Sequence, residues 1–412
     1  MSSLLCCLAP MDGFTDAACR SIFFRIRKQY GNHTKTQYKM RTEFMNADGY
    51  LRQPSRIVHH LLSCSDTPYP IVQIYGGNRE TLVEACHDIC RKYPFFPGIE
   101  LNIGCPSPSV MSCEAGAGMM KDKAKTLETV KQMSEACATY GMPFSIKTRL
   151  GLTSNDKQDQ IDFIHRAVPY CSMISVHART FKQGHSGDVD RETLYQIKEH
   201  FGDTITLIGN GGITSRDDMR SKAKNLDGIM IAQAAIANPW IFTPHIPTPQ
   251  DRYDIIKDHF LLMLGQEHWM NEQKKILTDD PTSVLMMPST DELRSRGVAV
   301  KQSYADQKLF SVLEYRKHLF GYLKTLVGAK DLKVKLATIT DPNHVSDALD
   351  EFFCKLSVIE MNLSNRGESP IKKILHRSTN LSHTQYSNQK HPHHFRIHLH
   401  ESSSYTETDT SL

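Results

Sequence analysis

Reactive and polar side chains follow several short apolar runs of this sequence, at the point where each run ends. Cys105 comes just after the run at residues 98–103, in the turn Asn102-Ile103-Gly104-Cys105-Pro106. A thiol on a tight turn is placed to deliver a proton or to act as a nucleophile. Lys147 ends a later run. A buried lysine needs a strong partner, and an anionic cofactor ring is one that would serve.

Three further run ends carry groups suited to binding a cofactor. Gln73 offers the donor and acceptor that the edge of a heterocyclic ring requires, and His177 offers a further hydrogen bond. The pair Gly211-Gly212 follows Asn210. Backbone N–H groups can approach a phosphate closely there, because glycine has no side chain.

Each residue also has a simpler interpretation when it is taken alone. Lys147 could pair with a core carboxylate such as Glu100, and Gly211-Gly212 could be only a turn. Cys105 and His177 could be inert residues of the core. Their joint position at the ends of successive runs favours one shared site.

The elements that must position these residues alternate along the chain. Eight apolar runs predict strands, and helical patterns such as those at residues 124–140 and 190–201 lie between them. Asp16 and Ser215 are placed to cap two of the helices. Eight βα units in about 240 residues predict an α/β protein with a closed (β/α)₈ TIM barrel. A doubly wound open sheet is the alternative, but no G-x-G-x-x-G follows the first strand. The predicted strands are residues 3–10, 37–44, 69–75, 98–103, 143–149, 171–177, 204–210 and 226–232.

The pattern changes after the barrel. Residues 253–267 and 307–327 have helical spacing without intervening strands, so we expect a catalytic barrel over residues 1–245 and a helical domain over residues 251–359. Polar, irregular residues at about 271–296 predict an inserted loop within that domain. Residues 362–412 are rich in Ser, Thr, His and Asn, and we expect a disordered tail, whose histidines are more typical of a solvated segment than of a metal site.

The composition sets outer limits on the function. The chain has 412 residues, of which 40% are hydrophobic, and a formal net charge of +4, which is compatible with a nucleic-acid partner but does not establish one. The 11 cysteines show no paired spacing of the kind that binds metals. We therefore expect no metal site, a reducing cytoplasmic location and a monomer. No stretch approaches the ~20 apolar residues of a membrane span, and we expect neither a signal peptide nor a membrane partner.

Over residues 4–353 the chain resembles the tRNA-dihydrouridine synthases, flavoenzymes that reduce uridine in tRNA. The combination of motifs is specific, although no single motif is. The motifs are APM at residues 9–11, NIGCPS at 102–107, GAGMMKD at 116–122, IKTRLG at 146–151, VHART at 176–180, NGG at 210–212, NPWIF at 238–242 and EYRKHLFGYL at 314–323.

The resemblance implies an enzyme that uses FMN, with NADPH or NADH as reductant and tRNA as substrate. It implies that Cys105 is the general acid, that Asn102 and Arg179 lie near the substrate base, and that Arg316, Lys317 and His318 face tRNA. It assigns the isoalloxazine ring to Gln73, Lys147 and His177. The remaining flavin contacts that it implies are Pro10, Met11, Asp12, Asn210, Gly211, Gly212, Ala232 and Gln233.

One position departs from the family's pattern. The family usually has Gly-Arg after the eighth strand, and this chain has Ala232-Gln233. A neutral amide therefore replaces a charged phosphate ligand, which predicts weaker flavin binding or a compensating cation elsewhere. Two other functions stay open from the residues: a flavin barrel that reduces a free small molecule, and a tRNA-binding homologue that has lost catalysis.

Overall fold

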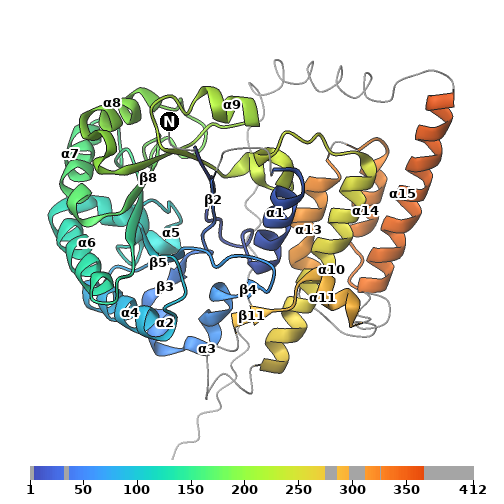
Figure 1. Ribbon diagram of the computed structural model, residues 1–412, viewed down its shortest axis with the longest axis horizontal. Helices are drawn as coiled ribbons and strands as arrows, with labels where there is room; N and C mark the ends of the chain where they lie inside the picture. The colour runs from blue at the N-terminus through green and yellow to red at the C-terminus, as the bar shows by residue number, and fades with distance from the viewer. Residues whose placement is uncertain (1–3, 32–36, 274–284, 297–310, 325, 366–412) are drawn as a thin grey trace, which may run out of the picture. The chain divides into compact units, whose positions relative to one another are not determined.

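A computed structural model describes residues 4–31, 37–273, 285–296, 311–324 and 326–365. Within these residues one parallel sheet runs in the order β2-β1-β10-β9-β8-β7-β6-β5-β3 (Figure 1). Each of the eight segments predicted to be strands contains a strand of this sheet. The strands are β1 (Leu5–Leu8), β2 (Gln37–Lys39), β3 (Met45–Asn46), β5 (Val72–Tyr75), β6 (Ile99–Asn102), β7 (Phe144–Arg149), β8 (Met173–His177), β9 (Thr206–Asn210) and β10 (Gly228–Ile231).

The sheet closes through a second barrel strand that is broken in two. β2 pairs with β1, whereas β3 pairs with β5 on the other side. Between them Arg41 forms a parallel bridge with Ile71, and the N–H of Thr42 donates to the Ile71 carbonyl at 2.9 Å. Residues 37–46 therefore pair with β1 on one side and with β5 on the other, which closes the sheet. The predicted (β/α)₈ barrel is confirmed.

The barrel interior is filled by side chains of alternate residues along its strands. Leu5 and Cys7 on β1, and Ala9 just after it, pack with Met173 from β8 and Met230 from β10. Alternation points these residues to one face of the strand. They form the floor on which groups at the carboxyl ends of the strands lie.

Helices follow the strands and begin where the sequence predicts caps. The side chain of Asp16 accepts the N–H of Cys19 at 2.8 Å at the start of α1 (Ala17–Tyr30), and Ser215 caps α9 (Arg216–Ser221). The two predicted helices at residues 124–140 and 190–201 are α6 (Lys123–Ala138) and α8 (Arg191–Phe201). The others are α2 (Ala47–Arg52), α3 (Pro54–Ile57), α4 (Arg79–Lys92), α5 (Pro108–Met111) and α7 (Lys157–Ala167).

After the last barrel strand the described chain is mainly helical. The helices are α10 (Pro249–Gln273), α11 (Thr290–Ser295), α13 (Ser311–Tyr322), α14 (Ala329–Leu336) and α15 (Pro342–Asn365). Residues 4–354 pack as one compact unit, and the remaining residues are assigned to a second unit. The division into a barrel domain and a helical domain stays a prediction. The predicted tail lies outside the described residues from 366 onward.

The expectation of an irregular insertion at about 271–296 is wrong for its described end. β11 (Met286–Met287) pairs in parallel with β4 (Ser63–Cys64), and α11 follows it. α11 begins at a capping box in which Ser289 and Glu292 each bond the other's backbone N–H. The sequence signal for this helix start, a Ser followed three residues later by a Glu, was present in the segment that we expected to be irregular. Residues 274–284 lie outside the described residues.

None of the described helices is both long and apolar enough to cross a membrane.

Candidate active site

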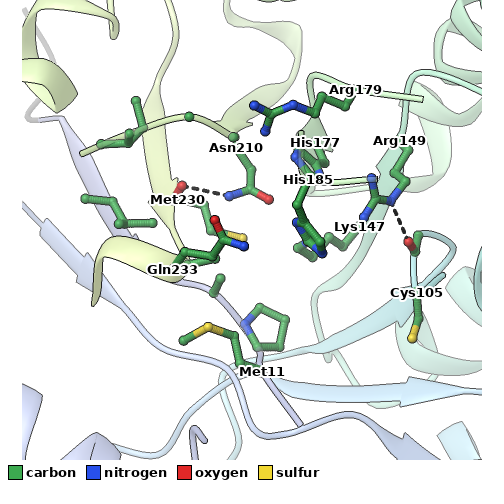
Figure 2. Close-up of a pocket in the computed structure, with 18 of the residues that line it drawn as sticks. Met11, Cys105, Lys147, Arg149, His177, Arg179, His185, Asn210, Met230 and Gln233 are labelled. Carbon is green, nitrogen blue, oxygen red and sulfur yellow. Dashed lines mark hydrogen bonds between the residues drawn. The ribbon is translucent and has the colours of Figure 1, made fainter. Parts of the chain in front are cut away.

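A cavity of about 350 Å³ opens at the carboxyl ends of the barrel strands. Figure 2 shows Lys147, His177 and His185 across the cavity from Met11 and Gln233. The structure thus brings most of the predicted site residues together around one cavity. The predicted residues that line the cavity are Pro10, Met11, Asn102, Cys105, Lys147, His177, Arg179, Asn210, Gly211, Gly212, Ala232 and Gln233.

The loop that carries Cys105 is held by several hydrogen bonds. The Asn102 side-chain oxygen accepts the N–H groups of Gly104 and Cys105, both at 2.9 Å. The Cys105 carbonyl accepts the N–H of Ala117 at 3.0 Å. Gly116, at φ +54°, passes so close that a Cβ there would lie 2.9 Å from the Cys105 carbonyl oxygen. The thiol is therefore presented from a fixed backbone on the cavity wall.

Burial raises the pKa of the Cys105 thiol above its ordinary value, and the nearby Asp12 carboxylate raises it further. The positive charges of Lys147 and Arg149 act in the opposite direction but do not reverse the shift. The thiol is consequently protonated at neutral pH, which is the state a proton donor needs.

Gln73 lies beneath the cavity wall and has no exposed surface. Its Nε2 donates to Glu100 at 2.6 Å, and its Oε1 accepts the Asn102 amide at 3.0 Å. Glu100 in turn forms a fully buried ion pair with Arg41 at 3.1 Å. Gln73 does not line the cavity, and its expected contact with a ring stays a prediction. A chain of hydrogen bonds runs from Arg41 through Glu100 and Gln73 to Asn102.

Lys147 is a cation without a counter-ion in the described structure. Glu100, the carboxylate considered for it from the sequence, is bound to Arg41 and Gln73 instead. Burial, together with the positive charge of Arg149, lowers the pKa of Lys147 to about 8. Its ammonium group lines the cavity and is available to an anionic ligand.

His177 is almost fully buried beside this cationic group. Burial, and then the charges of Arg149 and Lys147, lower the pKa of His177 to about 2. Burial and the same cations also lower the pKa of His185, whose ring centroid is 5.9 Å from that of His177. Both imidazoles are neutral at physiological pH, so each offers one donor and one acceptor.

Gly211 and Gly212 form the turn after β9, with φ values of +116° and +60°. A Cβ on Gly211 would meet the His177 ring at 2.8 Å, and one on Gly212 would meet Val189 at 2.7 Å. Their carbonyls accept hydrogen bonds from Arg191 at 2.7 and 3.0 Å. In the described part of the chain their own N–H groups have no acceptor, so they are available to an anion.

The loop after β10 completes this end of the cavity. Ala232 leads into the short 3₁₀ helix at Gln233–Ala235, whose first N–H groups also lie at the cavity. The arrangement of two adjacent loops after the seventh and eighth barrel strands is the one that binds phosphate in such barrels. Arg179 lines the same cavity and supplies positive charge there.

The family model described as "Dihydrouridine synthase" matches residues 7–274 of this chain. The chain belongs to the dihydrouridine synthase family. It is 31% identical over 239 residues to "Probable tRNA-dihydrouridine synthase" of Aquifex aeolicus, which covers 57% of this chain and 70% of that protein. It is 29% identical over 245 residues to "tRNA-dihydrouridine(20/20a) synthase" of Synechocystis, covering 57% and 69%. It is 28% identical over 210 residues to "tRNA-dihydrouridine(47) synthase [NAD(P)(+)]-like" of Xenopus tropicalis, covering 48% and 31%.

Several site residues expected for this dihydrouridine synthase do not line the cavity. Asp12 is exposed on the turn after β1 and lies outside the cavity wall. On α13, Arg316 is half-buried and donates to the Ile339 carbonyl at 2.7 Å. Lys317 forms an ion pair with Glu314. These contacts occupy the side chains that we expected to face tRNA.

The expectation that His318 faces tRNA is wrong, because its side chain is only 1% exposed. It lies on the buried face of α13 with Tyr315, Leu319 and Tyr322. Those residues recur at the helical spacing of an inward face. The same spacing was present in the sequence and would have identified His318 as a core residue.

The sequence analysis also missed Arg149 as a site residue. Its Nε donates to the Gly104 carbonyl at 2.8 Å, and its Nη1 donates to the Gly184 carbonyl at 3.1 Å. It thereby joins the Cys105 loop to the loop after β8. The available signal was the position of Arg149 at the end of a strand, two residues after Lys147.

Proposed function

We propose that this protein reduces the C5=C6 bond of uridine in tRNA to 5,6-dihydrouridine, with FMN in the barrel cavity and Cys105 as the proton donor. The observation that carries the proposal is the thiol itself. It is protonated, it lies on the cavity wall, and its loop is fixed by Asn102 and Arg149. Membership of the dihydrouridine synthase family and the names of its relatives support the substrate.

The residues present fit a flavin mononucleotide. Lys147 offers an uncompensated positive charge to an electron-rich ring, and the turn at Gly211 and Gly212, where a Cβ would collide with His177 and Val189, offers N–H groups to a phosphate. We assign the ring to Lys147 and His177, and the phosphate to the loops after β9 and β10. When bound and reduced by NADPH or NADH, the flavin supplies a hydride for C6 of uracil.

The protein's own part in the reaction is to hold a proton at Cys105 Sγ and to place it near C5. A raised thiol pKa keeps that proton in place until the base is bound. The Asn102 side chain is engaged at both ends by Gln73 and the Cys105 loop, so we assign it a positioning role. Arg179 lines the cavity and is assigned to the substrate base.

The target base must leave the stacked tRNA to reach this cavity, as in other base-modifying enzymes. Contacts with tRNA phosphates would then hold the remaining RNA. We assign these contacts to the exposed lysines that follow α13 and lie on α14, among them Lys324 and Lys330. We propose these lysines for the phosphate contacts, in place of Arg316 and His318.

The proposal is tested with Cys105→Ala. The flavin of each protein is reduced anaerobically with NADPH and mixed with tRNA transcribed in vitro, and flavin reoxidation is followed by absorbance while dihydrouridine is measured by mass spectrometry. We expect normal flavin binding and a reoxidation rate slowed by roughly 10²–10⁴, the usual contribution of a positioned acid. Cys113→Ala is the matched control, because Cys113 is exposed in the loop that follows and should not change the rate.

Three results would contradict the proposal. Reduction of tRNA by Cys105→Ala at the wild-type rate would remove the thiol from the reaction. Equal turnover of free uridine monophosphate and tRNA by the wild type would show a small-molecule reductase instead. A protein that neither binds FMN nor oxidises NADPH would be a non-catalytic homologue.

A further inference from the structure

Three potential metal ligands that the proposed reaction does not use come together away from the cavity. Cys19 lies on α1, His259 on α10 and His318 on α13, and one ligand atom from each lies within 4.8 Å of the other two. α1 packs beside α10, which packs against α13 (Figure 1). Residues far apart in the sequence therefore meet where the first barrel helix contacts the C-terminal helices.

The cluster is buried and its polar atoms are not satisfied by the protein. Cys19 is 4% exposed, His259 0% and His318 1%. Neither ring nitrogen of His318 has a hydrogen-bond partner in the described structure, and Nε2 of His259 has none either. Buried polar atoms are nearly always hydrogen-bonded in folded proteins, so three unsatisfied nitrogens in one cluster require an explanation.

The one nitrogen of the cluster that has a partner supports this interpretation. Nδ1 of His259 lies 3.1 Å from the Tyr322 hydroxyl, which fixes the ring and leaves Nε2 as its open nitrogen. Histidines that bind metals are commonly oriented by a hydrogen bond to the other ring nitrogen. The ring centroids of His259 and His318 are 4.5 Å apart, so the two imidazoles lie against each other.

We propose that Cys19, His259 and His318 bind one Zn²⁺ ion between α1, α10 and α13. Thiolate and imidazole are the ligands that zinc prefers in proteins. Zinc bonds of about 2.0–2.3 Å place tetrahedral ligand atoms about 3.3–3.8 Å apart, so these side chains need to move closer by about 1 Å. The thiol of Cys19 releases its proton on binding, and water completes the coordination.

Charges of both signs lie near the cluster: Asp16 is beside Cys19, and the positive charge of Lys317 adds to burial in lowering the pKa of His259 and of His318. Zn²⁺ with one thiolate leaves a net charge of +1. The Asp16 carboxylate accepts the Cys19 N–H at 2.8 Å and is therefore close enough to offset part of that charge. The ion would join the barrel to the C-terminal helices, a role independent of the reaction proposed for the cavity.

The full-length protein is loaded with zinc, dialysed and analysed for metal by mass spectrometry. We expect one zinc ion per chain that is lost in Cys19→Ser and in His318→Phe, which keeps an aromatic ring at position 318. Cys64→Ser is the matched control: Cys64 is also a buried thiol against α1, with its Sγ on the Ala17 carbonyl at 3.6 Å, but it lies outside the cluster. It should retain the metal.

Cobalt substitution separates this site from the histidine-rich tail. Co²⁺ at the cluster should give a thiolate-to-cobalt charge-transfer band and intense d–d bands at longer wavelengths than flavin absorbs. These bands should persist when the tail histidines are replaced by alanine. Because the bands are measured in the wild type, they show whether a cysteine thiolate binds the metal even if Cys19→Ser fails to fold. The proposal is overturned if the wild type gives no such bands, if all zinc disappears with the tail histidines, or if Cys64→Ser loses zinc equally. The tail residues are His391, His393, His394, His398 and His400.

Discussion

Lys147 makes the binding of FMN depend on pH in a range where its neighbours do not titrate. Its pKa is lowered to about 8 in the free protein. Hydrogen-bond acceptors on the edge of the oxidised flavin ring, which is neutral at these pH values, raise that pKa in the complex, so affinity is complete below about pH 8 and falls as the pH rises above it. The protonated fraction falls from about nine-tenths at pH 7 to about one-tenth at pH 9, which predicts about tenfold weaker binding, or ~1.4 kcal/mol.

The pKa values of the other titratable groups of the cavity lie outside the range from pH 7 to pH 9. Burial raises the pKa of Cys105 above its ordinary value, and the pKa of Arg149 is lowered only to about 10. His177 and His185 are neutral throughout, because their pKa values are lowered. The flavin phosphate, with a second pKa of about 6, is fully charged above pH 7.

The assay titrates flavin-free protein with FMN and follows the quenching of flavin fluorescence at pH 7, 8 and 9. Lys147→Met is the comparison, because it retains the aliphatic stem and loses the charge. We expect weaker binding at pH 7 in this variant and almost no change between pH 7 and 9. The reasoning is refuted if the wild type binds FMN equally at all three values, or if the variant keeps the wild-type slope.

Three further predictions concern the remaining parts of the site. Gln233→Arg should tighten FMN binding several-fold, because a charge-assisted hydrogen bond contributes about 1.5–3 kcal/mol against about 1 for a neutral one; unchanged affinity would mean that another cation already holds the phosphate. Arg149→Met should lower the free energy of unfolding in urea by about 1–3 kcal/mol, because buried carbonyls lose their donor; a stability equal to the wild type's would show that the Cys105 loop does not depend on it. Reversing the charges of Lys324 and Lys330 should weaken tRNA binding and reduce its salt dependence without changing FMN affinity. Unaltered binding at several salt concentrations would place the docking surface elsewhere.

The barrel was predictable because its signals are local. Five consecutive strands, β5 to β9, each end in a polar residue, and those ends meet at one rim by the geometry of parallel strands. Lys147, His177 and Gly211 were found in this way. The break in the second barrel strand was not found, because the apolar run at residues 37–44 gives no local sign that only Arg41 pairs, with Ile71, between β2 and β3.

What the sequence left open depended on partners that are distant along the chain. A pair between Lys147 and Glu100 was the simpler alternative for the lysine, but Arg41 binds the carboxylate and leaves Lys147 available to a ligand. Gln73 was assigned to a ring because its amide offers a donor and an acceptor, and its hydrogen bonds to Glu100 and Asn102 could not be read from the sequence. The zinc ligands proposed on three separate helices could not be read as a motif, because only the packing of those helices brings them together.

The hydrogen-bonded chain from Arg41 to the Cys105 loop has a consequence for how variants of this protein are classified. Arg41 is buried in the barrel floor, in the strand whose two halves close the sheet, whereas Cys105 belongs to the rim. Loss of the guanidinium would release Glu100, then Gln73, then Asn102, and with them the loop that presents the thiol. An activity screen would therefore score a defect in barrel closure as a defect in proton transfer, and only a measurement of folding would separate the two.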